Sequence, residues 1–189
     1  MVNLFSVLKA GLNMNVIETS LEGCVVIEPK TYQDQRGFFL ETYHQLKYSN
    51  IANIQDNFVQ DNYSRSAKDV LRGLHFQKTK PQGKLVRVVK GSVFDVAVDL
   101  RKNSATYGKH ESIVLSEENK KQFYIPPGFA HGFLVLTEFA DFEYKCTEFY
   151  DPSDEGSLLW NDDDIGIDWP CKEPVLSEKD THANKLNEI

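Results

Sequence analysis

Short runs of strand-forming residues follow one another along most of this 189-residue chain, and Gly, Pro, Asn or Asp closes many of them. Runs of this kind, rich in β-branched and aromatic residues, are typical of β-strands. The predicted strands are residues 24–27, 38–42, 58–63, 85–89, 93–100, 113–115, 122–125, 133–136 and 142–147. Many short strands at such spacing favour a sandwich or a barrel.

The longest of these runs shows the alternation of a strand most clearly. Phe94, Val96, Val98 and Leu100 share one face, and Asp95 and Asp99 share the other. Helical periodicity is weak, and short helices are expected only at residues 44–51 and near the C-terminus. The sequence therefore predicts an all-β fold, a jelly-roll β-sandwich or barrel with a few short peripheral helices. The mouth of such a barrel has room for a ligand.

Composition limits the domain organisation and the compartment. No repeat or linker interrupts the chain, so we expect one domain over residues 14–189 and an N-terminal extension of unknown role over residues 1–13, with Met14 as an alternative start. The apolar run in that extension is too short to span a membrane and lacks the features of a signal peptide. Three widely spaced cysteines are expected to be reduced thiols in a cytoplasmic protein.

The formal net charge of -7 argues against nucleic acid as a partner. An anionic ligand would need a local basic cluster, for which Arg36, Arg65 and Arg72 are candidates.

Two histidine-bearing segments resemble the signatures of a cupin barrel. They are RGLHFQ at residues 72–77 and PGFAH at residues 127–131, and they contribute His75 and His131. A metal-binding cupin has His-x-His, a carboxylate a few residues later and a further His in the second segment. Gln77 replaces the second His here, and residues 78–82 contain no carboxylate. This incomplete ligand set predicts no metal and favours acid–base chemistry.

Each candidate side chain also has an ordinary structural interpretation. His75 is either a core histidine or a general base, and Lys84 either reaches solvent or stabilises an anion inside the barrel. Tyr144 and Tyr150 are core or rim aromatics unless one donates a proton or stacks on a base. By composition, Asp180 belongs to a polar tail.

Taken together, the motifs resemble the dTDP-4-dehydrorhamnose 3,5-epimerase family over about residues 17–180. The motifs are DQRGFF at 34–39, FVQDN at 58–62, VLRGLHFQ at 70–77, QGKLVR at 82–87, VFDVAVD at 93–99, IPPGFAHGF at 125–133, EYK at 143–145, LWND at 159–162 and LSEKD at 176–180. The resemblance implies a cupin fold, a homodimer with some ligand contacts between subunits, and a dTDP-4-keto-6-deoxy sugar as substrate.

The resemblance also implies roles for individual residues. The catalytic set is His75 as the general base, Asp180 as its carboxylate partner, Tyr144 as the acid on the opposite face of the sugar, and Lys84 near the C4 oxygen. Tyr150 matches the tyrosine that stacks on thymine. The other positions expected to contact nucleotide or sugar are Arg36, Glu41, Gln60, Asp61, Asn62, Arg72, His131, Glu155 and Lys179.

The implied reaction is inversion at C3 and C5 through an enolate, which the C4 ketone makes accessible. It has no net redox change, so neither a metal nor a nicotinamide cofactor is expected. Three alternatives stay open: an epimerase acting at C3 alone, a metal-dependent cupin oxygenase, and a sugar-nucleotide binding module without catalysis. Tyr144 favours double epimerisation over the first of these.

Overall fold

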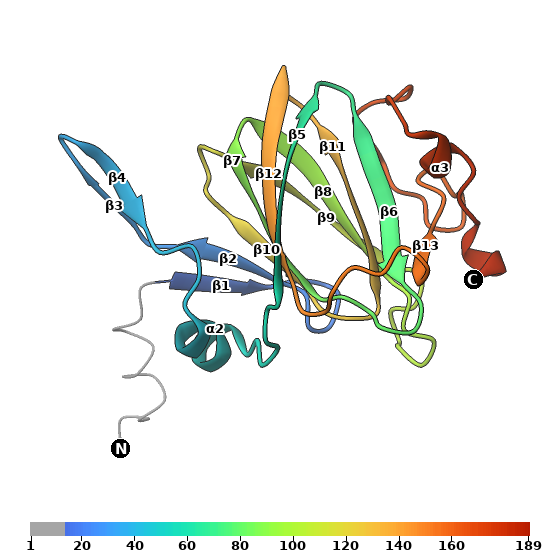
Figure 1. Ribbon diagram of the computed structural model, residues 1–189, viewed down its shortest axis with the longest axis horizontal. Coiled ribbons are helices and arrows are strands. Elements are labelled where there is room, and N and C mark those ends of the chain that lie inside the picture. The colour runs from blue at the N-terminus through green and yellow to red at the C-terminus, as the bar shows by residue number, and fades with distance from the viewer. Residues whose placement is uncertain (1–13) are drawn as a thin grey trace.

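The computed structural model describes residues 14–189, and two antiparallel sheets form most of it (Figure 1). The larger sheet has the strand order β1 (Met14–Glu18), β2 (Val25–Pro29), β10 (Gln122–Ile125), β7 (Lys84–Lys90), β12 (Phe139–Cys146) and β5 (Gln60–Ala67). The smaller sheet has the order β13 (Glu155–Ser157), β6 (Leu71–Gln77), β11 (Phe129–Val135), β8 (Ser92–Asp99) and β9 (His110–Ser116).

Short elements surround the two sheets. A hairpin of β3 (Thr31–Asp34) and β4 (Gly37–Leu40) projects from the body of the molecule (Figure 1). The helices are α2 (Gln45–Ala52), α3 (Glu178–Thr181) and the 3₁₀ turn η1 (Leu186–Glu188). Within residues 14–189, no helix is long and apolar enough to cross a membrane. The predicted all-β sandwich with short helices is confirmed. The division at residue 14 stays a prediction, because residues 1–13 lie outside the described range.

Both sheets are covered on their outer faces as well as packed against each other. The core between them contains Val86, Phe123 and Phe142. On the outside, the C-terminal segment packs Leu158 and Trp169 against the smaller sheet, whereas α2 packs against the larger one. Strand β8 therefore has two buried faces.

The predicted alternation along β8 is confirmed, but the face that carries the aspartates points into the core between the sheets. Asp95 and Asp99 are both fully buried, and Val93 and Ala97, which share their face, belong to the core between the sheets. The apolar face with Val96 packs instead under the C-terminal segment. A carboxylate in such a place needs polar partners, since burying a charge is costly. Asp99 has them in the following loop, from Arg101, Ser104 and Thr106.

An irregularity in β6 brings two site residues to the same side of the strand. Against β11, His75 lies opposite His131 and Arg72 lies opposite Phe133, so three steps along β6 match two steps along β11. Arg72 and His75 are three residues apart, a spacing that would put them on opposite sides of a regular strand. The β-bulge instead places both on the interior side. Gly73 allows the bulge: its φ is +127°, and a Cβ there would lie 2.6 Å from Gly132 Cα.

We expect Gly73→Ala to destabilise the protein by about 2 kcal/mol more than Gly37→Ala does, because overpacking adds to conformational strain. Gly37 is the matched control, since its φ is +128° but nothing lies within 4 Å of an added Cβ. Urea unfolding of both variants measures the difference. Equal losses would show that the contact with Gly132 has no energetic consequence.

Candidate active site

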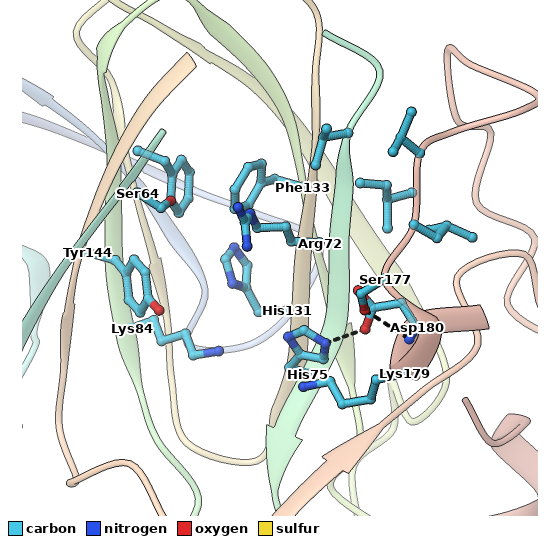
Figure 2. A pocket seen from close by; sticks show the side chains of 15 residues that line it. Ser64, Arg72, His75, Lys84, His131, Phe133, Tyr144, Ser177, Lys179 and Asp180 are labelled. Carbon is cyan, nitrogen blue, oxygen red and sulfur yellow. Dashed lines mark hydrogen bonds and ion pairs between the residues drawn. The ribbon is translucent and has the colours of Figure 1, made fainter. Parts of the chain in front are cut away.

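A cavity of about 650 Å³ lies between the sheets and is lined by side chains from both of them and from α3 (Figure 2). Its polar lining residues are Ser64, Arg72, His75, Lys84, His131, Tyr144, Ser177, Lys179 and Asp180. Phe133 and Phe142 form part of its apolar wall, with their rings stacked 4.1 Å apart. This volume is in the range of small-molecule sites.

His75 and Asp180 form the shortest polar contact in the cavity. Nε2 of His75 lies 2.6 Å from Oδ1 of Asp180, although 105 positions separate them in the sequence. The C-terminal segment makes this contact possible by running beside the start of β6, where Val70 and Val175 form a parallel bridge. Helix α3 follows, and Asp180 is its buried residue. Asp180, which composition assigns to a polar tail, is thus placed against His75.

The surroundings of Asp180 keep it ionised. Burial alone would raise the pKa of this carboxyl, but hydrogen bonds from His75, Ser177 and the backbone of Gly73 hold the pKa below its usual value. An ionised Asp180 accepts the hydrogen bond, so Nε2 of His75 carries the proton. In the neutral imidazole, Nδ1 then has the lone pair that a general base requires.

His131 forms a second pair with a carboxylate, deeper in the core. Its Nε2 lies 3.1 Å and 3.0 Å from the two oxygens of Asp95. Burial lowers the pKa of His131, and the nearby Asp95 charge only partly opposes this effect. His131 is therefore held neutral.

This buried neutral histidine predicts a loss of stability in mild acid. Free histidine takes up a proton near pH 6.5, so below about that pH the unfolded chain binds a proton that folded His131 resists. We expect the free energy of unfolding to fall as the pH drops from 7.5 to 5.5, and His131→Gln to reduce the slope. Urea titrations at both pH values measure the free energy of unfolding, and their difference gives the slope. His182→Gln, at an exposed histidine, should keep the wild-type slope; an unchanged slope in His131→Gln would contradict the assignment.

Lys84 and Tyr144 reach the cavity from neighbouring strands of the larger sheet, across from His75 (Figure 2). Burial lowers the pKa of the Lys84 ammonium, while Cys146, Asp95 and Glu155 act in the other direction. None of the ion pairs within residues 14–189 involves Lys84. Burial also raises the pKa of Tyr144 to about 12, so its phenol is protonated at neutral pH. The cavity thus brings together the imidazole of His75, a protonated phenol and the amino group of Lys84.

Other predicted contact residues lie at the cavity or close to it. Arg72 lines the cavity, and its Nε donates to Ser66 at 2.9 Å. Lys179 also lines it and pairs with Glu155 at 2.8 Å, and Glu155 accepts a hydrogen bond from the Tyr150 hydroxyl at 3.2 Å. Tyr150, Glu155 and Lys179 therefore form one chain of contacts that ends at the cavity.

The predicted triplet at residues 60–62 is divided by strand alternation. Gln60 and Asn62 lie on one face of β5 and are linked by a hydrogen bond of 3.0 Å. Asp61 has the opposite orientation and pairs with Lys145 at 2.9 Å. Arg65, two positions beyond Tyr63 on the same outward side, pairs with Asp141 at 2.6 Å. Within one chain, Asp61 and Arg65 are not brought to the cavity.

Arg36 and Glu41 also lie away from the cavity that contains His75. Arg36 sits at the turn of the β3–β4 hairpin and pairs with Asp34. Glu41 follows β4 and pairs with Lys47 of α2 at 2.7 Å. Each lines a different surface depression.

Several residues of the site were not predicted from the sequence. They are Ser64, Asp95, Phe133, Phe142 and Ser177. The sequence does contain a signal for Asp95, because a carboxylate in an otherwise apolar strand predicts that a polar partner is buried beside it. Among residues 14–189, no group of three or more His, Cys, Asp and Glu side chains converges as a metal site.

Comparison with known proteins identifies relatives that match most of the chain. The family model for dTDP-4-dehydrorhamnose 3,5-epimerase matches residues 18–188. The dTDP-4-dehydrorhamnose 3,5-epimerase of Methanothermobacter thermautotrophicus is 52% identical over 91% of this chain and 94% of its own length.

Solved structures show the same similarity. A 3,5-epimerase from Legionella pneumophila in complex with dTDP-4-keto-L-rhamnose has a TM-score of 0.91 and 52% identity, covering 93% of this chain and 94% of its own. A 3'-monoepimerase from Streptomyces bikiniensis in complex with dTDP-quinovose has a TM-score of 0.83 and 33% identity, covering 89% of this chain and 86% of its own.

Proposed function

Because this chain belongs to the dTDP-4-dehydrorhamnose 3,5-epimerase family, we propose that it inverts C3 and C5 of dTDP-4-dehydro-6-deoxy-D-glucose. The observation that carries the proposal is the cavity in which His75, paired with Asp180, faces Tyr144 and Lys84. The product would serve dTDP-L-rhamnose synthesis.

The chemistry of the substrate explains why these residue types are needed. The C4 ketone acidifies the hydrogens on C3 and C5, because loss of either proton gives an enolate. His75 removes a proton from one face, and the charge of Asp180 stabilises the resulting imidazolium. Tyr144 returns a proton from the other face, which inverts the carbon. Lys84 places its positive charge beside the enolate oxygen, where a single fixed donor contributes about 3 kcal/mol.

The remaining predicted residues would bind the nucleotide and the sugar. Tyr150 would stack on thymine, while Arg72, Lys179 and the neutral His131 contact the ligand within the cavity. Gln60 and Glu155 hydrogen-bond to Tyr150, and Asn62 hydrogen-bonds to Gln60, so these three would border the base.

A homodimer would explain the position of Arg36 and Glu41. The hairpin that carries Arg36 projects from the body and exposes Phe38 by 59% and Phe39 by 68% (Figure 1). Such large exposed aromatics suit a protein interface. We infer that the hairpin docks on a second copy and carries Arg36 and Glu41 to the partner's cavity. Sedimentation analysis should show a dimer, and Phe39→Asp should weaken it; a monomeric wild type would contradict this.

Epimerisation at C3 alone is the second candidate, since a 3'-monoepimerase is also similar to this chain. The chain is 52% identical to 3,5-epimerases but 33% identical to this 3'-monoepimerase, which favours double inversion. The decisive test is incubation with the 4-keto sugar nucleotide in deuterated buffer, followed by NMR. We expect deuterium at both C3 and C5. Deuterium at C3 alone would select the second candidate, and none at either carbon would contradict both.

A further inference from the structure

Gln77 occupies the position at which a metal-binding cupin has its second histidine, and its side chain binds backbone. It lies on β6 two residues after His75 and is 5% exposed. Its Nε2 donates to the carbonyl oxygens of Lys80 at 2.7 Å and Phe149 at 3.3 Å. Its Oε1 accepts from the backbone N–H of Asp151 at 2.7 Å. One buried amide thus connects two loops.

The contacts to Phe149 and Asp151 flank Tyr150 on both sides. The N–H of Tyr150 itself donates to Oε1 of Gln60 at 2.9 Å. Three successive residues of this loop are therefore bound by glutamines from β6 and β5, strands that belong to different sheets. The Tyr150 side chain, by contrast, is 49% exposed. The backbone is held in place while the ring remains accessible.

We propose that Gln77 is a positioning residue for nucleotide binding, which holds the backbone around Tyr150 so that the ring is preorganised for the base. This inference rests on the proposed function for the role of Tyr150. Ordering a loop on binding reduces affinity, and a loop already ordered avoids that loss. Only an amide suits the position, because the site presents two carbonyl acceptors and one N–H donor.

The position of these contacts predicts which kinetic constant changes. Gln77 makes no hydrogen bond to His75, Asp180 or Tyr144. Its loss should therefore weaken binding of substrate and transition state alike, which raises KM and leaves kcat unchanged. For Gln77→Leu we expect dTDP to bind about tenfold more weakly, the effect of a loss of about 1.4 kcal/mol.

A double-mutant cycle with dTDP as the ligand tests the proposal. Calorimetry would compare the wild type, Gln77→Leu, Tyr150→Ala and the double variant. If Gln77 acts through Tyr150, then Gln77→Leu causes no further loss of affinity once the ring is absent. KM should rise about tenfold in Gln77→Leu, with kcat within twofold of the wild type.

Thr137→Val is the matched control. Thr137 accepts from the N–H of Ser92 at 2.9 Å and donates to the carbonyl of Phe139 at 2.8 Å, so valine also removes loop-tethering bonds. It precedes β12, whereas the loop with Tyr150 follows β12. We expect this variant to lower Tm and to bind dTDP like the wild type.

Four results would overturn the inference. Additive losses in the cycle, or unchanged dTDP affinity in Gln77→Leu, would overturn this inference but leave the proposed function standing. A wild type that does not bind dTDP would overturn the proposed function and this inference with it. If Gln77→Leu does not fold, Gln77→Glu replaces it, since a carboxylate retains the acceptor for Asp151 but cannot donate to the two carbonyls. Its dTDP affinity should fall, and wild-type affinity would overturn the proposal.

Discussion

Replacing His75 with alanine is expected to abolish deuterium uptake at both C3 and C5. The reason is that the same imidazole would remove both protons. Its Nε2–H is bound to Asp180 at 2.6 Å, which leaves Nδ1 to accept a proton. Loss of a general base lowers rates by about 10²- to 10⁴-fold. NMR in deuterated buffer measures uptake at each carbon, and kcat for product formation should fall in parallel.

Two controls separate this loss of chemistry from a loss of structure. His75→Ala should bind dTDP like the wild type, because Arg72 and Tyr150 are intact, and exposed His182→Ala should retain full activity. Asp180→Asn should lower kcat while KM stays unchanged, since the imidazole loses the carboxylate that orients it. Deuterium uptake at the wild-type rate at either carbon in His75→Ala would show that another group is the base for that carbon.

Much of the fold was predictable because local pattern and tertiary environment agree. The run at residues 122–125 coincides with β10, whose residues are all buried. The pattern predicts a strand at residues 58–63, whereas the polar strand β5 spans Gln60–Ala67. Its inward side, with Gln60, Asn62 and Ser64, faces the cavity region instead of an apolar core, so the hydrophobic signal is absent there. Strand β1 was not predicted, since its pairing with β2 stabilises a run that is itself partly polar.

The site was less predictable from local pattern than the fold. Composition could not connect His75 with Asp180, because their contact depends on the path of the C-terminal segment beside β6. Only the family resemblance supplied that pair. The resemblance did not indicate Asp95, whose contact with His131 depends on the register of β8 and β11. The sequence shows only that Gln77 replaces a metal ligand, and the structure adds that its amide binds backbone groups of two loops.

Tyr144→Phe is expected to uncouple proton exchange from inversion. The base is intact in this variant, so His75 still removes a proton and can return a deuteron from solvent to the same face. Without the phenol, the opposite face lacks its acid, and inversion should fall by about 10²- to 10⁴-fold. Deuterium uptake with retained configuration should therefore exceed formation of the epimer. NMR reports both quantities in one experiment, from isotope content and coupling pattern.

The position of Tyr144 makes this outcome specific. It lies on β12 of the larger sheet, whereas His75 lies on β6 of the smaller one, so the two groups approach a ligand from different walls (Figure 2). Tyr63, 60% exposed on the neighbouring strand and facing outward, provides the control, and Tyr63→Phe should invert normally. If exchange and inversion fall equally in Tyr144→Phe, the phenol acts already in proton removal. If inversion proceeds at the wild-type rate, another group protonates that face.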